Sequence, residues 1–194
     1  MIARKCLHIA LLPLPFLLLF ATLTLLSSFF LYLLPIFLLL QIFFLFFFRD
    51  MPRSIEEGII SPADGKVMHA GDGRVSIFMS LLDMHVNLMP CDGKIVGMRH
   101  YPGRHAPAYG DVGKNERMEI DIESSAGRVR VIQIAGMVAR RIVPYVEEGD
   151  VLKKGEKMGI IRFGSRVDVI LPEKWRVVVK RGQKIKAGET IAVK

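Results

Sequence analysis

Hydrophobic and polar positions divide the chain into two very different parts. From Ile9 to Phe48 there are 40 consecutive residues without a charged side chain. From Arg49 onward, apolar residues recur in short runs that are separated by charged residues, glycine and proline. The second part, with 146 of the 194 residues, is long enough to bury a core and to fold as one domain.

The apolar run predicts a transmembrane helical hairpin over residues 1–48. A helix rises about 1.5 Å per residue and the hydrocarbon core of a bilayer is about 30 Å thick, so this run is about twice the length of one span. Ser27 and Ser28, near its middle, suit the turn, and the nearby prolines would cap or kink the helices. A cleaved signal peptide is the alternative, but its apolar stretch is only about 7–15 residues long.

Basic residues on both flanks of the run set the expected orientation. Arg4 and Lys5 precede it, and Arg49 and Arg53 follow it. Because basic flanks stay on the cytoplasmic side, the domain should lie at the cytoplasmic face of the cell membrane. This domain has 25 basic and 19 acidic residues, a balance that attracts anionic lipid headgroups. Nucleic acid would also be attracted, but the hairpin makes lipid the expected partner.

Beyond residue 49 the pattern is that of β-strands. Val75–Met79, Arg128–Ile134 and Val167–Leu171 are short runs rich in β-branched side chains, bounded by glycine, proline or aspartate. The segment Glu116–Glu123 alternates apolar and charged residues, as a half-buried strand does. Long stretches of helical period are absent from this part of the sequence, so we expect a mainly β domain.

Two internal repeats indicate how these strands are organised. Residues 62–67 read Pro-Ala-Asp-Gly-Lys-Val and residues 90–95 read Pro-Cys-Asp-Gly-Lys-Ile, each a turn followed by the start of a strand. Residues 146–156 align with residues 179–189 at an offset of 33, with matching glycines and a matching glutamate. Two copies of one design predict a pseudo-symmetric β-sandwich. The pattern resembles the barrel-sandwich hybrid fold of lipoyl and biotinyl carrier domains.

A further set of motifs resembles a known family. The string Arg-Phe-Gly-Ser-Arg-Val-Asp at 162–168 is similar to the processing site of short-type phosphatidylserine decarboxylase proenzymes, which act on phosphatidylserine in bacteria and archaetidylserine in archaea. Other matching strings occur in the same order, at 48–53, 61–67, 76–80, 85–87, 115–117, 133–136 and 139–143. Several of them are six or seven residues long, so chance agreement is remote.

The resemblance implies a lyase that is made as a zymogen and cuts itself between Gly164 and Ser165. The Ser165 hydroxyl would attack the carbonyl of Gly164, and glycine offers the smallest obstacle to that attack. The products would be a β chain (1–164) and an α chain (165–194) that stay together as a heterodimer. Ser165 would become a pyruvoyl group, whose ketone forms a Schiff base with the amine of a serine phospholipid and acts as an electron sink for decarboxylation.

The same resemblance suggests roles for three more residues. Asp64 matches the acidic residue that activates the serine for self-cleavage, although Asp-Gly is also an ordinary turn, as at Asp92. His85 could protonate the substrate carbon after carbon dioxide leaves, because imidazole titrates near neutrality. Long-type family members place a second histidine three residues later, where this chain has Leu88. His105 is therefore a further candidate for proton transfer.

Arg140 and Arg141 are candidates for binding the lipid phosphate, since guanidinium groups pair well with phosphate oxygens. Adjacent residues of a strand face opposite ways, so at most one of them would reach the site from a strand. No spacing of metal ligands occurs, and we expect no metal. The alternative class is a non-enzymatic membrane adaptor or carrier module with a lipoyl-like domain. Whether the lipid backbone is diacyl or isoprenoid ether stays open, because the chemistry takes place at the headgroup.

Overall fold

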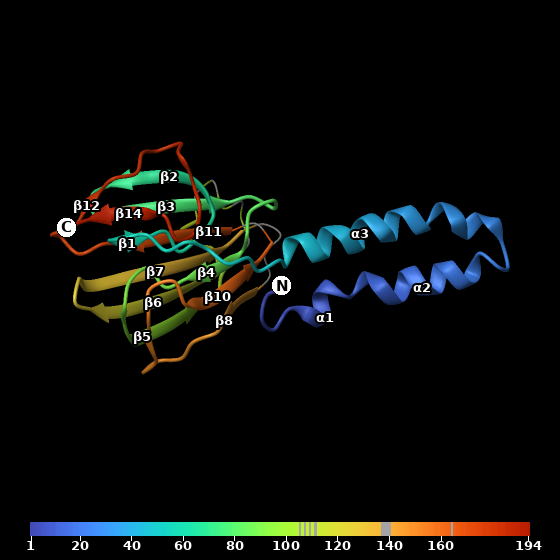
Figure 1. Ribbon diagram of the computed structural model, residues 1–194, viewed down its shortest axis with the longest axis horizontal. Coiled ribbons are helices and arrows are strands. Elements are labelled where there is room, and N and C mark those ends of the chain that lie inside the picture. The colour runs from blue at the N-terminus through green and yellow to red at the C-terminus, as the bar shows by residue number, and fades with distance from the viewer. Residues whose placement is uncertain (105, 107, 109, 111, 137–140, 164) are drawn as a thin grey trace. The chain divides into compact units, whose positions relative to one another are not determined.

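A computed structural model describes residues 1–194 apart from 105, 107, 109, 111, 137–140 and 164 (Figure 1). The chain forms two compact units, Met1–Met51 and Pro52–Lys194. The second unit contains the β-strands, and the first is helical. The prediction of a mainly β fold that follows an N-terminal helical segment is therefore confirmed.

The first unit is a helical hairpin. Its outer arm includes α1 (Leu7–Ala10) and α2 (Pro13–Leu23), and its return arm includes the 3-10 helix η1 (Ser28–Tyr32) and α3 (Leu34–Phe47). The two arms run side by side in Figure 1, and the ring of Phe37 stacks on those of Phe16 and Phe20 with centroids 5.7 and 4.8 Å apart.

The turn of this hairpin lies where the serines predict it. The hydroxyl of Ser27 accepts a hydrogen bond from the amide of Phe29, which caps the start of the return arm. The segment Ser28–Phe47 has 20 residues and a mean hydropathy of 2.6, so it is long and apolar enough to cross a membrane. The apolar segment Leu7–Leu23 is shorter than this.

The second unit consists of antiparallel strands in one large sheet and two small ones. The large sheet has the order β13-β2-β3-β11-β7-β6-β5-β9, and the small sheets have the orders β1-β14-β12 and β4-β10-β8. The strands are β1 (Ile59–Ile60), β2 (Gly65–Gly71), β3 (Arg74–Met79), β4 (Val86–Leu88), β5 (Gly93–Tyr101), β6 (Arg117–Ser124), β7 (Gly127–Ala135), β8 (Arg141–Pro144), β9 (Val151–Leu152), β10 (Lys157–Arg162), β11 (Ser165–Ile170), β12 (Arg176–Val177), β13 (Lys184–Ile185) and β14 (Thr190–Val193).

The order of the large sheet shows that the domain has two matching halves. Read from one edge it begins β13-β2-β3-β11, and from the other edge it begins β9-β5-β6-β7. The segments before β2 and β5 exchange equivalent hydrogen bonds: the amide of Ile60 donates to the carbonyl of Pro90 at 3.0 Å, and the amide of Leu88 donates to that of Pro62 at 2.9 Å. These pairs are related by the offset of 28 between the first two repeats.

The second pair of repeats obeys the same symmetry. The amide of Gly182 donates to the carbonyl of Val67 at 2.7 Å, and the amide of Gly149 donates to that of Ile95 at 2.8 Å. Both glycines have positive φ angles, 89° and 101°, a conformation that side chains with a Cβ rarely adopt. The prediction of a pseudo-symmetric β-sandwich from these repeats is confirmed.

The two halves differ in how the chain builds them. Strands β4 to β10 form one half from a continuous stretch, whereas the other half combines β1–β3 with β11–β14. The chain thus returns from the continuous half to the interrupted one between β10, which ends at Arg162, and β11, which begins at Ser165. In the large sheet β11 lies between β3 and β7, β13 pairs with β2, and β14 lies between β1 and β12 in a small sheet. A segment that starts at Ser165 is thus held by strands from the rest of the domain.

Candidate active site

Ser165 is the first residue of β11 and is completely buried. In the sheet it lies opposite Met79 of β3 on one side and Ala135 of β7 on the other. Its hydroxyl donates a hydrogen bond to the sulfur of Met79 at 3.3 Å. A thioether is a weak acceptor, so this contact holds the hydroxyl only loosely. Gly164, its partner in the predicted cut, lies outside the residues that the structure describes.

The backbone just before this point has an unfavourable conformation. Phe163 has a φ angle of 65°, in the left-handed region, where a bulky side chain costs roughly 1–2 kcal/mol. It follows directly after β10, which ends at Arg162. The turn between β10 and β11 therefore stores conformational energy beside the predicted cut.

Asp64 lies at the same end of the large sheet as Ser165, but two strands away. Gly65 begins β2, and a Cβ at this glycine would lie 2.1 Å from a carbonyl oxygen of β3, so only glycine allows the two strands to approach here. With strands about 4.8 Å apart, the backbones of Asp64 and Ser165 are roughly 10 Å apart. One carboxylate oxygen of Asp64 accepts a hydrogen bond from the amide of Ala187 at 2.8 Å, and the other forms an ion pair with Arg53.

His85 precedes β4 and is completely buried. Its Nδ1 lies 2.9 Å from the carbonyl oxygen of Asp83, a contact that requires a proton on Nδ1. In the neutral ring Nε2 is then the nitrogen that accepts a proton. The carbonyl of His85 accepts a hydrogen bond from the amide of Ile161 at 3.4 Å, which brings the histidine beside the end of β10 and the turn into Ser165.

The structure also reveals a polar pair that is linked to Ser165 through the sulfur of Met79. The side-chain amide of Gln133 on β7 donates to the Oδ1 of Asn87 on β4 at 2.7 Å, and the amide of Asn87 contacts the sulfur of Met79 at 3.8 Å. All three side chains are completely buried. Both polar residues occur in the matching strings at 85–87 and 133–136. No sequence pattern links them, because the contact depends on the packing of two sheets.

The remaining sequence candidates have different outcomes. Leu88 is buried in β4 and offers no proton-transfer group. Arg141 is exposed at the start of β8 and lies opposite Arg162, near the end of β10. His105 and Arg140 lie outside the part of the chain that the structure describes.

The symmetry of the domain provides a direct comparison for Asp64. Its counterpart is Asp92, whose Oδ1 accepts a hydrogen bond from the amide of Lys154 at 2.6 Å, as Asp64 accepts one from Ala187. Each aspartate therefore binds the equivalent loop of its own half of the domain. What distinguishes Asp64 is its burial and its place at the end of the sheet where β11 begins.

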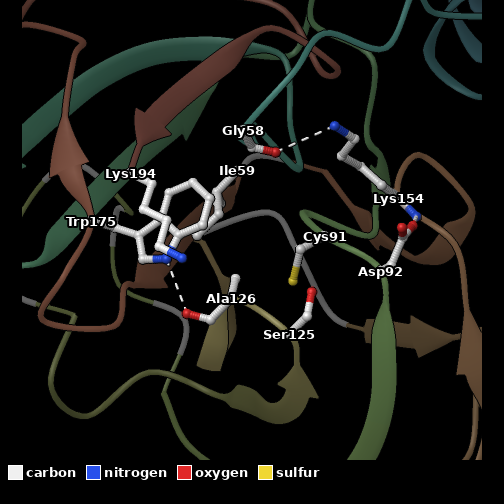
Figure 2. Close-up of a pocket in the computed structure, with 9 residues that line it drawn as sticks. All are labelled: Gly58, Ile59, Cys91, Asp92, Ser125, Ala126, Lys154, Trp175 and Lys194. Carbon is white, nitrogen blue, oxygen red and sulfur yellow. Dashed lines mark hydrogen bonds between the residues drawn. The ribbon is translucent and has the colours of Figure 1, made fainter.

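A cavity of about 310 Å³ lies beside Asp92 (Figure 2). Its wall contains Cys91 and Trp175, and the indole of Trp175 donates to the carbonyl of Ala126 at 3.0 Å. Burial raises the pKa of the Cys91 thiol, which keeps it protonated and a poor nucleophile. The cavity beside Asp92 therefore holds no activated cysteine, and neither Ser165 nor His85 lines it.

Comparison with known proteins identifies the family of the chain. The family model for phosphatidylserine decarboxylase matches residues 40–193. A protein of Archaeoglobus fulgidus named as an archaetidylserine decarboxylase proenzyme is 48% identical over 79% of this chain and 78% of its own length. The phosphatidylserine decarboxylase proenzyme of Syntrophus aciditrophicus is 41% identical over 91% of this chain and 92% of its own length. The non-enzymatic adaptor interpretation is therefore wrong, and the chain is a decarboxylase that belongs to the phosphatidylserine decarboxylase family.

Proposed function

We propose that the protein cuts itself between Gly164 and Ser165 and then decarboxylates a serine phospholipid to the ethanolamine phospholipid. The observation that carries this proposal is the position of Ser165. It is a buried serine at the first residue of a central strand, after a strained turn, where the chain passes between the two halves of the domain. A cut at this point would leave the α chain held by the strands on either side of β11.

The maturation steps use the atoms of Ser165 itself. Its hydroxyl oxygen attacks the carbonyl carbon of Gly164, the C–N bond breaks, and the glycine acyl group moves from nitrogen to oxygen as an ester. Loss of the Cα proton of Ser165 then expels the carboxylate of Gly164 and leaves a dehydroalanine. Addition of water and loss of ammonia give the pyruvoyl group, which would supply an electron-accepting ketone that condenses with the substrate amine.

The residues around Ser165 fit such a group. The position is excluded from solvent, and the sulfur of Met79, which the Ser165 hydroxyl contacts, is also contacted by the amide of Asn87, the partner of Gln133. The Oε1 of Gln133 is buried and has no hydrogen-bond partner among the described residues. This oxygen is an acceptor for an N–H or O–H group that arrives with the cut or with the substrate.

We assign the activation of the Ser165 hydroxyl to Asp64 and the return of a proton to the substrate carbon to His85. Two strand spacings, roughly 10 Å, separate the backbones of Asp64 and Ser165, so Asp64 acts through bridging water or after the backbone at Phe163 rearranges. His85 is fixed by its Nδ1 contact to Asp83, which directs proton exchange to Nε2. The apolar hairpin supports attachment to a membrane, with the domain at the cytoplasmic face, close to its lipid substrate.

A matched pair of variants tests the role of Asp64. Asp64→Asn and Asp92→Asn both keep an acceptor for a loop amide, but only the first removes a carboxylate near Ser165. We expect Asp64→Asn to accumulate as uncut precursor and Asp92→Asn to be cut like the wild type, as judged by gel mobility and intact mass. Equal cutting of the two variants would remove Asp64 from the mechanism.

A further inference from the structure

A second cavity, of about 460 Å³, opens beside the first residues of β2. Its lining includes Asp64 together with three lysines, Lys66, Lys184 and Lys186. Lys66 lies opposite Phe78 on β3, and Phe78 lies opposite Arg166, the residue after Ser165. Lys66, Phe78 and Arg166 share the outer face of the large sheet, because adjacent residues of a strand face opposite ways and Ser165 is buried on the inner face. The cavity therefore opens on the outer face, at the end of the sheet where β11 begins.

The charges in this cavity are arranged for an anion. Lys66 and Lys184 lie directly opposite each other on neighbouring antiparallel strands, and like charges in this position repel. None of the three ammonium groups forms an ion pair with a described residue, whereas Asp64 is paired with Arg53 and Glu189 accepts the amide of Lys186 at 3.0 Å. The lining has a third carboxylate, Asp83, which accepts hydrogen bonds from the amide and the hydroxyl of Ser80 at 2.8 and 2.7 Å. All three carboxylates of the lining therefore have described partners, whereas the three ammonium groups form no ion pair with a described residue.

The rim of the cavity is apolar. Leu82 lines it and is 68% exposed, and the neighbouring Leu81 is 40% exposed. Two adjacent exposed leucines beside three lysines suit a ligand with an anionic group next to a hydrocarbon chain. A phospholipid has this form, because its phosphodiester is joined through glycerol to its tails.

We infer that this cavity binds the phosphodiester of the lipid substrate, with Lys66, Lys184 and Lys186 contacting its oxygens and Leu81 and Leu82 facing its tails. This inference rests on the proposed function. It differs from the expectation drawn from the arginine pair, because Arg141 lies on β8 in a small sheet and is not part of this lining.

The matching half of the domain indicates that the charge of Lys184 is not needed for folding. The counterpart of Lys184 is Val151, which is 76% exposed, so the same loop forms without a charge there. The counterparts of Lys66 and Lys186 are Lys94 and Lys153, and the amide of Lys153 donates to Glu156 at 2.8 Å, as that of Lys186 does to Glu189. Lys94 and Lys153 are therefore matched controls on a surface that does not line the cavity.

The test compares two double variants of the full chain in uncharged detergent micelles. Lys184→Glu with Lys186→Glu reverses charges in the cavity, and Lys94→Glu with Lys153→Glu reverses charges in the other half. Intact mass first measures the fraction cut, and kcat and KM are then measured for a dispersed serine phospholipid. We expect the cavity variant to be cut normally and to show at least about a tenfold rise in KM, with a smaller change in kcat. A rise of this size corresponds to the loss of one charge-assisted hydrogen bond. The control should stay within about twofold of the wild type, since exposed charges contribute little.

Two further measurements separate the possible outcomes. Lys184→Val copies the residue of the other half, so it should fold and still raise KM. A KM equal to that of the control in properly cut cavity variants would overturn the inference. Inhibition by inorganic phosphate in the wild type but not in the cavity variant, with lipid KM unchanged in both, would assign the cavity to free phosphate and also overturn it. An uncut or inactive wild type would instead contradict the proposed function.

Discussion

The left-handed conformation of Phe163 leads to a quantitative prediction about self-cleavage. Its φ of 65° costs roughly 1–2 kcal/mol in a residue with a bulky Cβ substituent. After the cut, this part of the chain becomes the free end of the large chain and can relax. If this energy is released on the way to the transition state, removing it should slow cleavage by about 5- to 30-fold, since 1.36 kcal/mol corresponds to a factor of ten.

Phe163→Gly removes the strain, because glycine adopts positive φ without penalty. Phe163→Ala keeps the strain and removes only the ring. We expect the glycine variant to be cut more slowly and the alanine variant to be cut at nearly the wild-type rate. The assay is a time course of precursor and product by intact mass after cell-free synthesis in the presence of detergent.

A control for the glycine substitution is available elsewhere in the chain. Asp72, in the turn between β2 and β3, also has a positive φ, 49°, but lies away from the cut. Asp72→Gly should therefore leave the rate of cleavage unchanged. Cleavage of Phe163→Gly at the wild-type rate, or equal slowing of Phe163→Gly and Phe163→Ala, would refute the role of backbone strain.

Three other predictions concern stability. Gly65→Ala should lower the free energy of unfolding by about 2–4 kcal/mol in chemical denaturation, because its Cβ would meet a β3 carbonyl at 2.1 Å, whereas Gly97→Ala, with its nearest neighbour at 3.6 Å, should cost much less. Gln133→Leu should lower the free energy of unfolding by about 1–3 kcal/mol, because it leaves the Oδ1 of Asn87 buried without its donor. Adding Asn87→Leu should recover part of this loss, which a double-mutant cycle would measure. Hydrogen bonds from β14 lower the pKa of Glu56. Its contribution to the free energy of unfolding is therefore complete above about pH 4.5 and is lost as the pH falls through the lowered pKa. Glu56→Gln should make the profile of stability against pH flatter on its acid side.

The two-fold organisation of the domain could be predicted because short sequence repeats encode it. The repeats at 62–67 and 90–95, and at 146–156 and 179–189, carry the turn glycines and aspartates that each half needs, so the two-fold design is visible before the fold is known. The helical hairpin is visible for a similar reason, since a long uncharged run and a central pair of serines leave few other arrangements.

The contacts within the site could not be predicted in the same way. The ion pair between Arg53 and Asp64 joins a linker to a turn, and the pair of Asn87 and Gln133 joins two different sheets. Such contacts depend on how sheets pack, and no periodicity within either segment encodes them. The lysine cavity is likewise formed by β2 and β13, which are distant in sequence but adjacent in the sheet.

Intact mass spectrometry of the purified, detergent-extracted protein tests the central claim most directly. The account predicts two chains, residues 1–164 and a fragment of residues 165–194 that begins with a pyruvoyl group, and predicts that Ser165→Ala remains a single chain. A folded wild-type protein that is found only as the uncut chain of 21.9 kDa would contradict self-cleavage at Ser165.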